Sequence, residues 1–575
     1  MTEKVVGIEH QDFKTVREKG CFYIDKTLFI KEWWEEKDAV TLITRPRRFG
    51  KTLNMSMVEK FFSVQYAGRE DLFQGLKIWE DETFRKLQGT YPVLFISFAN
   101  IKEQNYEMAR KKICQLLSSL YSQHQFLLDE GALHEKEKDF FRSVSMEMDD
   151  VSAAMAIHEL CLYLSRYYGR QVIILLDEYD TPMQEAYING FWDQMVSLTR
   201  NIFNAAFKTN PYLERAIMTG ITRVSKESVF SDLNHLEVVT STSEKYAECF
   251  GFTEEEVFDA LDEFGLAHRK REVKTWYDGF TFGSISDIYN PWSILNYLDK
   301  ERLAAYWANS SSNSLVSKLL REGGKGVKQE FEQLMKGGHI EVEIDEQVIY
   351  DQLPVIKNAI WSLLLASGYL KVITTEFIEL TGRTIYYLAV TNKEVFLMFK
   401  TIIHEWFEQA DDVYNDFVKA LLFGDLDAMN EYMNHVTDVV FSSFDTGKKP
   451  SKSQPERFYH GFVLGLMIEL DGRYVLTSNR ESGFGRYDIM LEPLYPDRDD
   501  GIVMEFKVFQ PKKEKNLEDT AEAALQQIED KKYDTALLAK GIPKERIRKY
   551  GFAFKGKEVW IGESLLKESV NPACR

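Results

Sequence analysis

The chain has 575 residues, of which 44% are hydrophobic and 28% are charged, and its formal net charge is −19. This length predicts about three or four domains of ordinary globular composition, and the negative charge argues against a protein whose whole surface coats nucleic acid. The sequence has no run near the roughly 18–20 apolar residues of a membrane span, no apolar signal segment at its start and no CxxC pair among its five cysteines, so we expect a cytoplasmic protein without a membrane partner.

Apolar, strand-like runs alternate with amphipathic helical stretches in the first part of the chain. The strand candidates are AVTLIT (39–44), YPVLFISF (91–98), QVIILLDE (171–178) and ERAIMTGI (214–221). This alternation predicts a doubly wound α/β domain with a largely parallel, buried sheet. The helical, Glu- and Lys-rich segment 105–165 is expected to cover the sheet or to form a lid.

The first strand candidate leads into a basic loop, residues 45–50 (RPRRFG), and then into Lys51, Thr52 and a helical pattern. Backbone N–H groups at such a helix start can bind phosphate oxygens. Lys51 would reach the β- and γ-phosphates of ATP, and Thr52 would bind Mg²⁺. The pattern GxxxxGK[ST] would place glycine where this chain has Arg45. The extra arginines could contact phosphates or pair with carboxylates. The expected nucleotide contacts in the loop are Arg45, Pro46, Arg47, Arg48, Phe49 and Gly50.

The third strand candidate ends in two acids, which is the form of a Walker B strand. Asp177 would hold Mg²⁺ and Glu178 would polarise the attacking water. A buried strand that merely ends in two surface acids is the alternative, but its occurrence together with the strand–GKT–helix pattern favours a nucleotide site. The next strand ends near Thr219, expected at the γ-phosphate. Arg223 follows it as a sensor, as an arginine finger in a homo-oligomer, or as the partner of a surface acid.

Residues 250–330 have a helical pattern, and a helix followed by two alternating runs in 335–395 is compatible with a winged-helix-like module. A further helical stretch covers 393–440. The segment 441–455 (FSSFDTGKKPSKSQP) is rich in Ser, Lys and Pro and is the best linker candidate.

Near the end of the chain, an acid precedes an apolar strand and is followed by a strand with an E-x-K sequence. Strand alternation places Glu505 and Lys507 on one face and Phe506 on the other. Asp488 on the preceding strand can share that face, so the two carboxylates can bind Mg²⁺ or Mn²⁺. Lys507 can orient the water that attacks a phosphodiester. This is the PD-(D/E)XK pattern of nucleases, and a surface salt bridge between Glu505 and Lys507 is the alternative.

Neighbouring segments extend this predicted nuclease site. Glu456 and His460 share one helix face, with Glu456 as a further metal ligand, and Gln527 on a downstream helix could line the same cleft. Residues 501–575 contain 15 Lys and Arg against 12 Asp and Glu. This local excess gives weak support to a phosphate-backbone partner, with a solvated surface as the alternative.

The chain resembles a mostly bacterial family that joins an AAA-ATPase-like domain to a PD-(D/E)XK nuclease domain. The resemblance implies ATP binding and a metal-dependent nuclease fold. It also implies that a basic loop, with arginine where the GxxxxGK[ST] pattern has its first glycine, is normal for this family. It leaves the FYIDKT, WYDGF and YWANSSSN strings without derived chemistry; Tyr23 and Asp25 could lie near the nucleotide or only pack. The strings that carry it are FYIDKT (22–27), RPRRFGKT (45–52), YPVLFISF (91–98), LLDEYD (175–180), TGITRVSKESVFSDLN (219–234), WYDGF (276–280), YNPWSI (289–294), YWANSSSN (306–313), ERFYHGF (456–462), SNRESGFGRYDIML (478–491), EFK (505–507) and ALQQIEDKKY (524–533).

We therefore predict a P-loop ATPase-type domain (1–250), its helical extension (251–330), a winged-helix-like and helical region (331–445) and an α/β restriction-endonuclease-like domain (446–575). The leading hypothesis is an ATP-regulated nuclease that acts on DNA or RNA, in defence or in handling mobile elements. The alternative is a nucleotide-switched signalling or scaffold NTPase whose nuclease-like domain only binds nucleic acid or a partner.

Overall fold

The computed structural model divides into two compact units, Met1–Met398 and Phe399–Arg575. The predicted internal boundaries at 250, 330 and 445 stay predictions. The structure describes residues 5–129, 131, 133–208, 210–222, 230, 235–308, 316–317, 319–320, 325–335, 337–344, 357–408, 414–442, 463, 467–470, 473–478, 481–482, 485–486, 488–556 and 558–564.

A five-stranded sheet forms the centre of the first unit, and its strand order is β2-β3-β4-β1-β5. All neighbouring strands are parallel, which confirms the predicted parallel α/β domain. Because parallel strands end at one edge of a sheet, the residues that follow β1, β3 and β4 meet there. The strands are β1 (Val40–Thr44), β2 (Val93–Ser97), β3 (Val172–Asp177), β4 (Leu213–Gly220) and β5 (Leu236–Val239).

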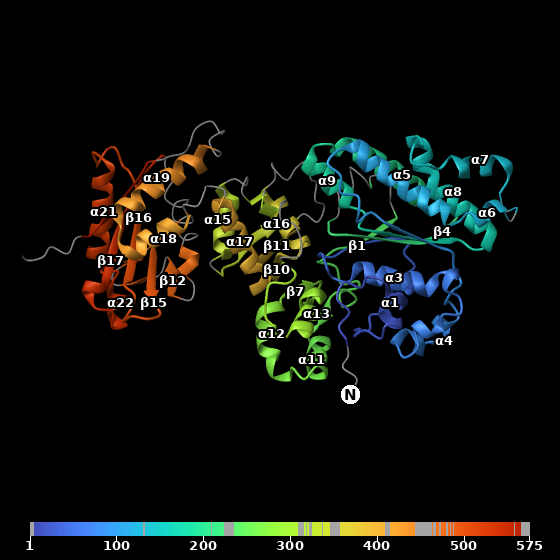
Figure 1. The fold of residues 1–575 in the computed structure, drawn as a ribbon, viewed down its shortest axis with the longest axis horizontal. Helices are drawn as coiled ribbons and strands as arrows, with labels where there is room; N and C mark the ends of the chain where they lie inside the picture. Colours follow the sequence, from blue (N-terminus) through green and yellow to red (C-terminus); the bar gives the residue numbers. More distant parts are fainter. Residues whose placement is uncertain are drawn as a thin grey trace, which may run out of the picture. The chain divides into compact units, whose positions relative to one another are not determined.

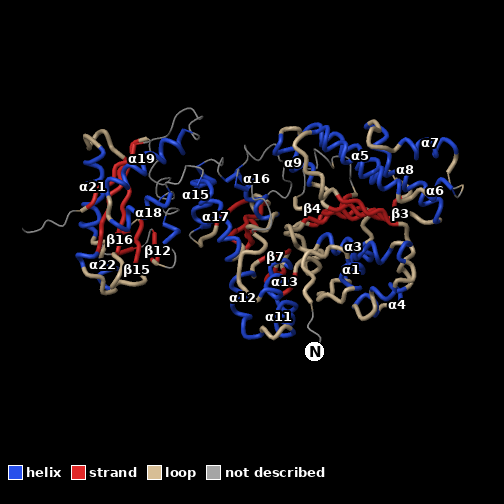
Figure 2. The backbone as a smooth tube through the Cα atoms, viewed as in Figure 1, coloured by secondary structure: helices blue, strands red, loops and turns tan. Residues whose placement is uncertain are grey.

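Helices cover both faces of this sheet (Figures 1 and 2). Alternate residues of a strand point to opposite faces, so Leu42 packs in one core cluster and Ile43 in the other. The segment 105–165 forms helices whose apolar residues pack in the same core cluster as Leu42, so it covers that face of the sheet. The helices are α1 (Phe13–Glu18), α2 (Leu28–Glu36), α3 (Lys51–Phe62), α4 (Glu82–Arg85), α5 (Tyr106–Ser122), α6 (Phe126–Asp129), α7 (Glu135–Ser143), α8 (Asp150–Tyr168), α9 (Thr181–Asn189) and α10 (Trp192–Phe203).

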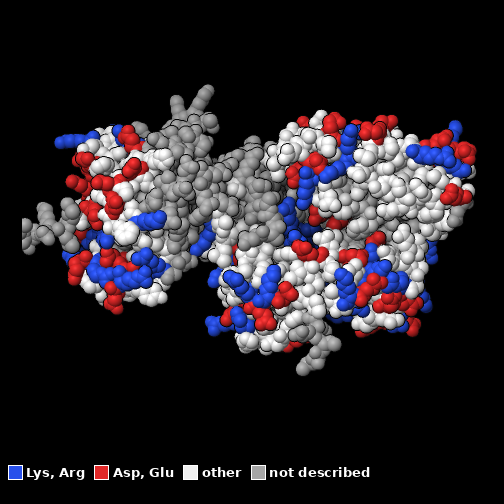
Figure 3. Space-filling model, in the orientation of Figure 1, with Lys and Arg blue, Asp and Glu red and all other residues white. Residues whose placement is uncertain are grey.

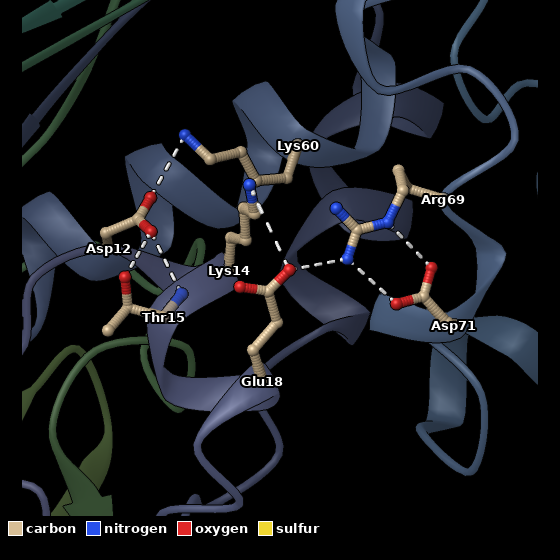
Figure 4. Close-up of polar contacts among 7 residues, drawn as sticks. All are labelled: Asp12, Lys14, Thr15, Glu18, Lys60, Arg69 and Asp71. Atoms are coloured by element: carbon tan, nitrogen blue, oxygen red, sulfur yellow. Dashed lines mark hydrogen bonds and ion pairs between the residues drawn. The ribbon is translucent and has the colours of Figure 1, made fainter.

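Polar contacts join α1 to α3, the helix that follows the basic loop (Figure 4). Asp12 caps α1 by accepting hydrogen bonds from the Thr15 amide (2.9 Å) and hydroxyl (2.8 Å). Its other carboxylate oxygen lies 3.1 Å from Lys60 Nζ on α3. Arg69 contacts Glu18 at the end of α1 at 2.8 Å. These contacts hold the outer side of α3 in place.

Replacing Asp12 with asparagine should remove a pH-dependent stabilisation, because asparagine keeps the helix cap but not the charge. Burial raises the pKa of Asp12, but hydrogen bonds from Thr15 and the charge of Lys60 outweigh it and lower the pKa to about 2. The carboxylate therefore stabilises the fold above its unfolded pKa of about 3.9, and this contribution is lost as the pH falls toward 2. We expect a loss of about 1 kcal/mol at pH 7, allowing for solvent screening. Denaturant unfolding at pH 7 and pH 3.5 measures it; a difference between the two proteins that does not shrink with falling pH would contradict it.

A helical layer with a small antiparallel sheet follows the five-stranded sheet. Its apolar residues form a separate core cluster that includes Val257, Tyr277 and Tyr297. The helices were predicted, but the sheet was not, because its strands have only two, three and five residues. The elements are β6 (Phe252–Thr253), α11 (Glu254–Glu263), α12 (Lys270–Tyr277), β7 (Phe280–Phe282), β8 (Ile285–Tyr289) and α13 (Pro291–Lys300).

The last part of the first unit contains the predicted helix and hairpin. The hairpin strands pair antiparallel, and a third strand pairs with the second of them. The name winged-helix-like stays a prediction for this part. The elements are α15 (Lys325–Met335), β9 (Ile340–Glu343), α16 (Lys357–Ala366), β10 (Leu370–Ile378), β11 (Arg383–Val390) and α17 (Lys393–Glu408), which continues into the second unit.

The second unit is built on a mixed sheet of order β12-β15-β16-β17-β18, in which only β16 and β17 pair in parallel. One face packs on α18 and α19, and the other packs on α21 and α22. No helix among the described residues has the length and apolar character needed to cross a membrane. The elements are α18 (Tyr414–Phe423), α19 (Leu426–Ser442), β12 (Tyr474–Ser478), β13 (Glu481–Ser482), β14 (Gly485–Arg486), β15 (Ile489–Pro493), β16 (Gly501–Val508), α21 (Leu517–Lys531), α22 (Thr535–Ala539), β17 (Ile547–Lys555) and β18 (Glu558–Glu563).

Candidate functional site

The basic loop connects β1 directly to the first turn of α3. Gly50 precedes the helix with φ 78°, a conformation that favours glycine, and Arg48 also has a positive φ of 65°. The buried ammonium group of Lys51 donates hydrogen bonds to the carbonyl oxygens of Arg45 and Pro46, both at 2.8 Å. The loop thus closes around the lysine that was predicted to bind phosphate.

Three strand ends meet beside this loop, as the parallel sheet requires. Thr52 Oγ1 on α3 donates a hydrogen bond to Asp177 Oδ2 at 2.8 Å. Thr219 at the end of β4 donates to the other oxygen of Asp177, and its hydroxyl accepts from the Glu178 amide at 3.3 Å. The structure therefore brings together the predicted Mg²⁺ ligands Thr52 and Asp177 with the predicted γ-phosphate contact Thr219.

Burial shapes the charges of this cluster. It lowers the pKa of the Lys51 ammonium, which the neighbouring carboxylates of Glu178 and Asp177 partly oppose. It raises the pKa of Asp177, against the hydrogen bonds from Thr219 and Thr52. A buried cation and a buried carboxylate thus lie close together at one edge of the sheet, and each has lost the solvation that stabilises its charged form.

Glu178 and Asp180 follow the strand end in different ways. Glu178 has a positive φ of 52° and accepts a hydrogen bond from Thr181 Oγ1 at 3.1 Å. Asp180 is 1% exposed and accepts from the backbone amides of Ile221 (3.0 Å) and Thr222 (2.9 Å). Asp180 therefore fixes the chain just after β4. The local sequence does not indicate this role, because Asp180 is the third acid in LLDEYD and its partners lie about 40 residues away.

Arg45 is fully buried and points away from the phosphate-binding side of the loop. Its guanidinium donates to the carbonyl oxygens of Thr44 (3.0 Å) and Thr240 (2.7 Å) and lies 4.4 Å from the ring centre of Phe282. Burial lowers its pKa to about 10. Neither of the predicted roles of this side chain, phosphate contact or pairing with a carboxylate, describes this placement. Arg45 instead anchors the loop to the segment after β5.

The other loop residues contact the helical layer around α13. Arg48 lies over the ring of Trp292 at 4.1 Å, and the buried Phe49 packs edge-on against Phe280 at 4.7 Å between ring centres. Arg47 is exposed, and its guanidinium donates to Gln184 Oε1 at 3.3 Å. Arg223 lies outside the described residues, so its predicted role stays a prediction.

The second site lies on the central parallel strand pair of the C-terminal sheet. Lys507 Nζ donates to Gln527 Oε1 at 2.7 Å, and the amide nitrogen of Gln527 contacts Glu505 Oε1. Phe506 points to the opposite face and packs against Phe552, with ring centres 4.9 Å apart. This confirms the alternation expected for Glu505 and Lys507. Gln527 on α21 joins the two side chains.

Asp488 directly precedes β15, and its neighbour Ile489 pairs with Met504. Its Oδ2 accepts a hydrogen bond from the Phe506 amide at 2.8 Å, which places the carboxylate against β16 between Glu505 and Lys507. Two carboxylates on adjacent strands fit a hard cation such as Mg²⁺ or Mn²⁺, which takes oxygen ligands and keeps several waters. Glu456 and His460, the other predicted members, lie outside the described residues.

Tyr533 was not predicted as a separate site residue. Its hydroxyl accepts a hydrogen bond from Gln527 Nε2 at 3.2 Å. Burial raises its pKa, and the charges of Glu505 and Asp488 add to that shift. Tyr533 is therefore a neutral group beside both carboxylates. Tyr533 follows Gln527 by six residues in the sequence. Because α21 ends at Lys531, the chain turns there and Tyr533 lies beside Gln527.

Several basic side chains of the second unit form ion pairs with acids of the same unit. In Figure 3, Lys and Arg side chains of this unit gather around α22. Arg546 and Arg548 pair with Asp500, and Lys540 pairs with Glu492. Arg546 directly precedes β17 and Arg548 is its second residue, whereas Lys507 pairs with Ala553 near the end of that strand. Arg546 and Arg548, two members of the predicted basic excess, therefore lie toward the opposite end of β17 from Lys507.

The comparisons with known proteins agree with both sites. A family model described as predicted AAA-ATPase matches residues 6–230, which contain the basic loop, Asp177 and Thr219. A model of the PD-(D/E)XK nuclease superfamily matches residues 454–564, which contain Asp488, Glu505 and Lys507. The chain joins an AAA-ATPase-like domain to a PD-(D/E)XK nuclease superfamily domain. The resemblance drawn from the sequence is thereby confirmed.

The chain is also similar to a protein of Azotobacter chroococcum mcd 1 described as "Uncharacterized protein in vnfD 5'region". The two are 28% identical over 325 residues, which cover 56% of this chain and 57% of that protein. The match thus spans just over half of each chain.

The side chains of the FYIDKT string make contacts inside the first unit. Asp25 accepts hydrogen bonds from Thr27 Oγ1 (2.6 Å) and from the Lys77 amide (2.7 Å). Lys26 Nζ donates to Glu256 Oε2 at 2.6 Å, and the Tyr23 hydroxyl contacts Met57 on α3 at 3.4 Å. These contacts favour the packing alternative for Tyr23 and Asp25 over a place at the nucleotide.

Proposed function

We propose that this protein binds ATP with Mg²⁺ in its AAA-ATPase-like domain and uses the bound nucleotide to control metal-dependent cleavage of nucleic acid by its nuclease superfamily domain. The observation that carries the proposal is the arrangement of Glu505, Lys507 and Gln527 on one face, with Asp488 beside them. A surface salt bridge does not need a second strand carboxylate and a helix amide that contacts both partners.

The side chains of the nucleotide site are of the types that would bind ATP and Mg²⁺. The Lys51 ammonium would exchange two loop carbonyls for phosphate oxygens, which form stronger, charge-assisted hydrogen bonds. Thr52 and Asp177 would hold Mg²⁺, which neutralises phosphate charge when bound. Glu178 would orient and polarise the water that attacks the γ-phosphate, and Thr219 would fix Asp177 and the Glu178 backbone in position.

The second site supports hydrolysis of a phosphodiester. Asp488 and Glu505 would hold Mg²⁺ or Mn²⁺, which supplies a Lewis acid at the scissile phosphate when bound. Lys507 would orient the attacking water and stabilise negative charge as it develops on phosphate oxygen. Gln527 keeps Lys507 and Glu505 in fixed positions, so these groups need little reorganisation during the reaction.

The test is cleavage of labelled single- and double-stranded DNA and RNA by the full chain. We expect cleavage that requires Mg²⁺ or Mn²⁺, stops with a chelator and changes in rate when ATP is added. The same assay decides between DNA and RNA, which the site leaves open. No cleavage of any of these substrates, with either metal and with or without ATP, would exclude a nuclease acting on them.

A second function, a nucleotide-switched scaffold whose C-terminal domain only binds nucleic acid or a partner, has one observation in its favour. Asp488 Oδ2 and Glu505 Oε1 each already contact a protein N–H group. Titration of Mn²⁺ into the full chain, monitored by calorimetry, separates the two. Binding that is lost in Glu505→Gln supports the nuclease, whereas no binding at Asp488 and Glu505 supports the scaffold.

A further inference from the structure

A continuous set of hydrogen bonds runs from the basic loop to the start of α17. Asn290 caps α13, where its Oδ1 accepts from the Trp292 amide at 2.9 Å, and its Nδ2 donates to the Arg47 carbonyl at 3.3 Å. One turn into α13, Ser293 Oγ donates to Glu394 Oε2 at 2.8 Å. Glu394 lies in the first turn of α17. The Asn290–Arg47 and Ser293–Glu394 links join elements that are far apart in the sequence.

Glu394 is unusual because it is a fully buried carboxyl group outside both predicted sites. It is 0% exposed, and its Oε1 accepts a hydrogen bond from the Trp307 amide at 2.6 Å. Burial raises its pKa to about 7. Its two oxygens therefore join α13 and the chain at residue 307 to the start of α17. Glutamine has the same shape and can make both contacts, with its carbonyl toward Trp307 and its amide toward Ser293.

A second set of contacts also connects the basic loop to the start of α17. Pro46 packs on Gly368 so closely that a Cβ at position 368 would lie 2.7 Å from Pro46 Cγ. The Gly368 carbonyl accepts a hydrogen bond from Thr391 Oγ1 at 2.7 Å. Thr391 lies two residues before α17 begins at Lys393. Two adjacent residues of the basic loop, Pro46 and Arg47, are thus tied to the start of the same helix.

We propose that Asn290 and Glu394 are positioning residues of the nucleotide site, and that through them nucleotide binding changes the start of α17. The proposal rests on the nucleotide site proposed above and names how that site is regulated. α17 is the helix that passes from the first compact unit into the second.

The physical reason lies in the loop carbonyls that Lys51 holds. In the structure, its ammonium donates hydrogen bonds to the carbonyl oxygens of Arg45 and Pro46. When phosphate takes the ammonium, these two carbonyls lose their donor, and the peptide bonds next to the Arg47 carbonyl are released from that restraint. Asn290 holds the Arg47 carbonyl, so it transmits any rotation there to α13. By linkage, the effect of nucleotide on α17 equals the effect of the α17 contacts on nucleotide affinity.

The test measures the affinity of the full chain for ADP and for a non-hydrolysable ATP analogue with Mg²⁺ by calorimetry. Asn290→Ala and Glu394→Ala should lower the affinity by about 5- to 30-fold, within the usual range of coupling between sites. Glu394→Gln should restore it to within about twofold, since it keeps both contacts. The matched control is Asn296→Ala, which removes another buried amide of α13 whose contacts stay within that helix; its affinity should not change.

Hydrogen exchange of the peptides covering α17 gives a second measurement that does not depend on how well each variant folds. Nucleotide should change exchange near residues 393–402 in the wild-type chain and not in Lys51→Met. Wild-type nucleotide binding with unchanged affinity in Asn290→Ala and no change in α17 exchange would overturn this proposal alone. A wild-type chain that binds no nucleotide would instead overturn the proposed nucleotide site.

Discussion

Replacing Lys507 with methionine is expected to slow nucleic-acid cleavage by about 100- to 10,000-fold, the usual effect of removing a proton-transferring or water-orienting group. Lys507 donates a hydrogen bond to Gln527, which in turn contacts Glu505, so its positive charge lies beside the expected metal ligands. Methionine keeps most of the apolar length of lysine, so the strand packing should survive. The loss should appear in the rate at saturating substrate and metal, because Asp488 and Glu505 remain to hold the ion.

Single-turnover cleavage of the substrate found in the wild-type assay measures this loss. Lys540→Met is the matched control, since Lys540 is an exposed lysine of the same unit that pairs with Glu492; its cleavage rate should stay within about twofold of wild type. Nucleotide affinity should be the same in both variants. If Lys507→Met cleaves at the wild-type rate, Lys507 has no part in the chemistry.

Replacing Lys51 with methionine is expected to lower the affinity for ATP and Mg²⁺ by about 10- to 150-fold. The reason is the loss of a buried ammonium group that would bind phosphate oxygens, and a hydrogen bond to a charged group contributes about 1.5–3 kcal/mol. Lys51 is 5% exposed and close to the carboxylates of Glu178 and Asp177. Its removal also leaves these carboxylates without a compensating charge, which further opposes binding of an anion.

Calorimetric titration of the nucleotide measures this change, and thermal unfolding checks that the domain is intact. Lys60→Met is the control, because Lys60 is a similarly buried lysine of α3 whose partners are Asp12 and Glu59. If ATP controls cleavage as proposed, the residual cleavage by Lys51→Met should no longer respond to ATP. Unchanged ATP affinity in Lys51→Met would show that the basic loop does not bind phosphate.

The Lys60 control compares two lysines of α3 that the sequence pattern does not distinguish. Lys51 and Lys60 stand on one helix with similar burial, yet only Lys51 contacts the loop carbonyls. A helical pattern alone places both lysines, but the partners on α1 and on the loop decide what each can do. The same reasoning applies to two asparagines of α13. Asn290, which caps the helix, has a partner outside it, whereas Asn296 donates to a carbonyl within the helix.

Residues close together in the sequence determined much of this protein. Four apolar runs became the parallel strands β1 to β4, because continuous burial on both faces favours such strands. The order strand, GKT, helix placed Lys51 and Thr52 at a strand end. The two-residue period of a strand placed Glu505 and Lys507 on one face. These features depend on local backbone geometry, which neighbouring residues set without contacts to distant segments.

Contacts between distant segments decided the rest. The direction of Arg45 depends on carbonyls near residues 240–246, and the role of Glu394 depends on Ser293 and Trp307. The short strand β7 packs Phe280 and Phe282 against Phe49 of the basic loop, about 230 residues earlier in the chain. None of these partners lies within the few residues that set helix or strand periodicity. The sequence by itself therefore determined the two folds and the residue types at each site, whereas the tertiary structure decided which side chains meet there and which ones hold them.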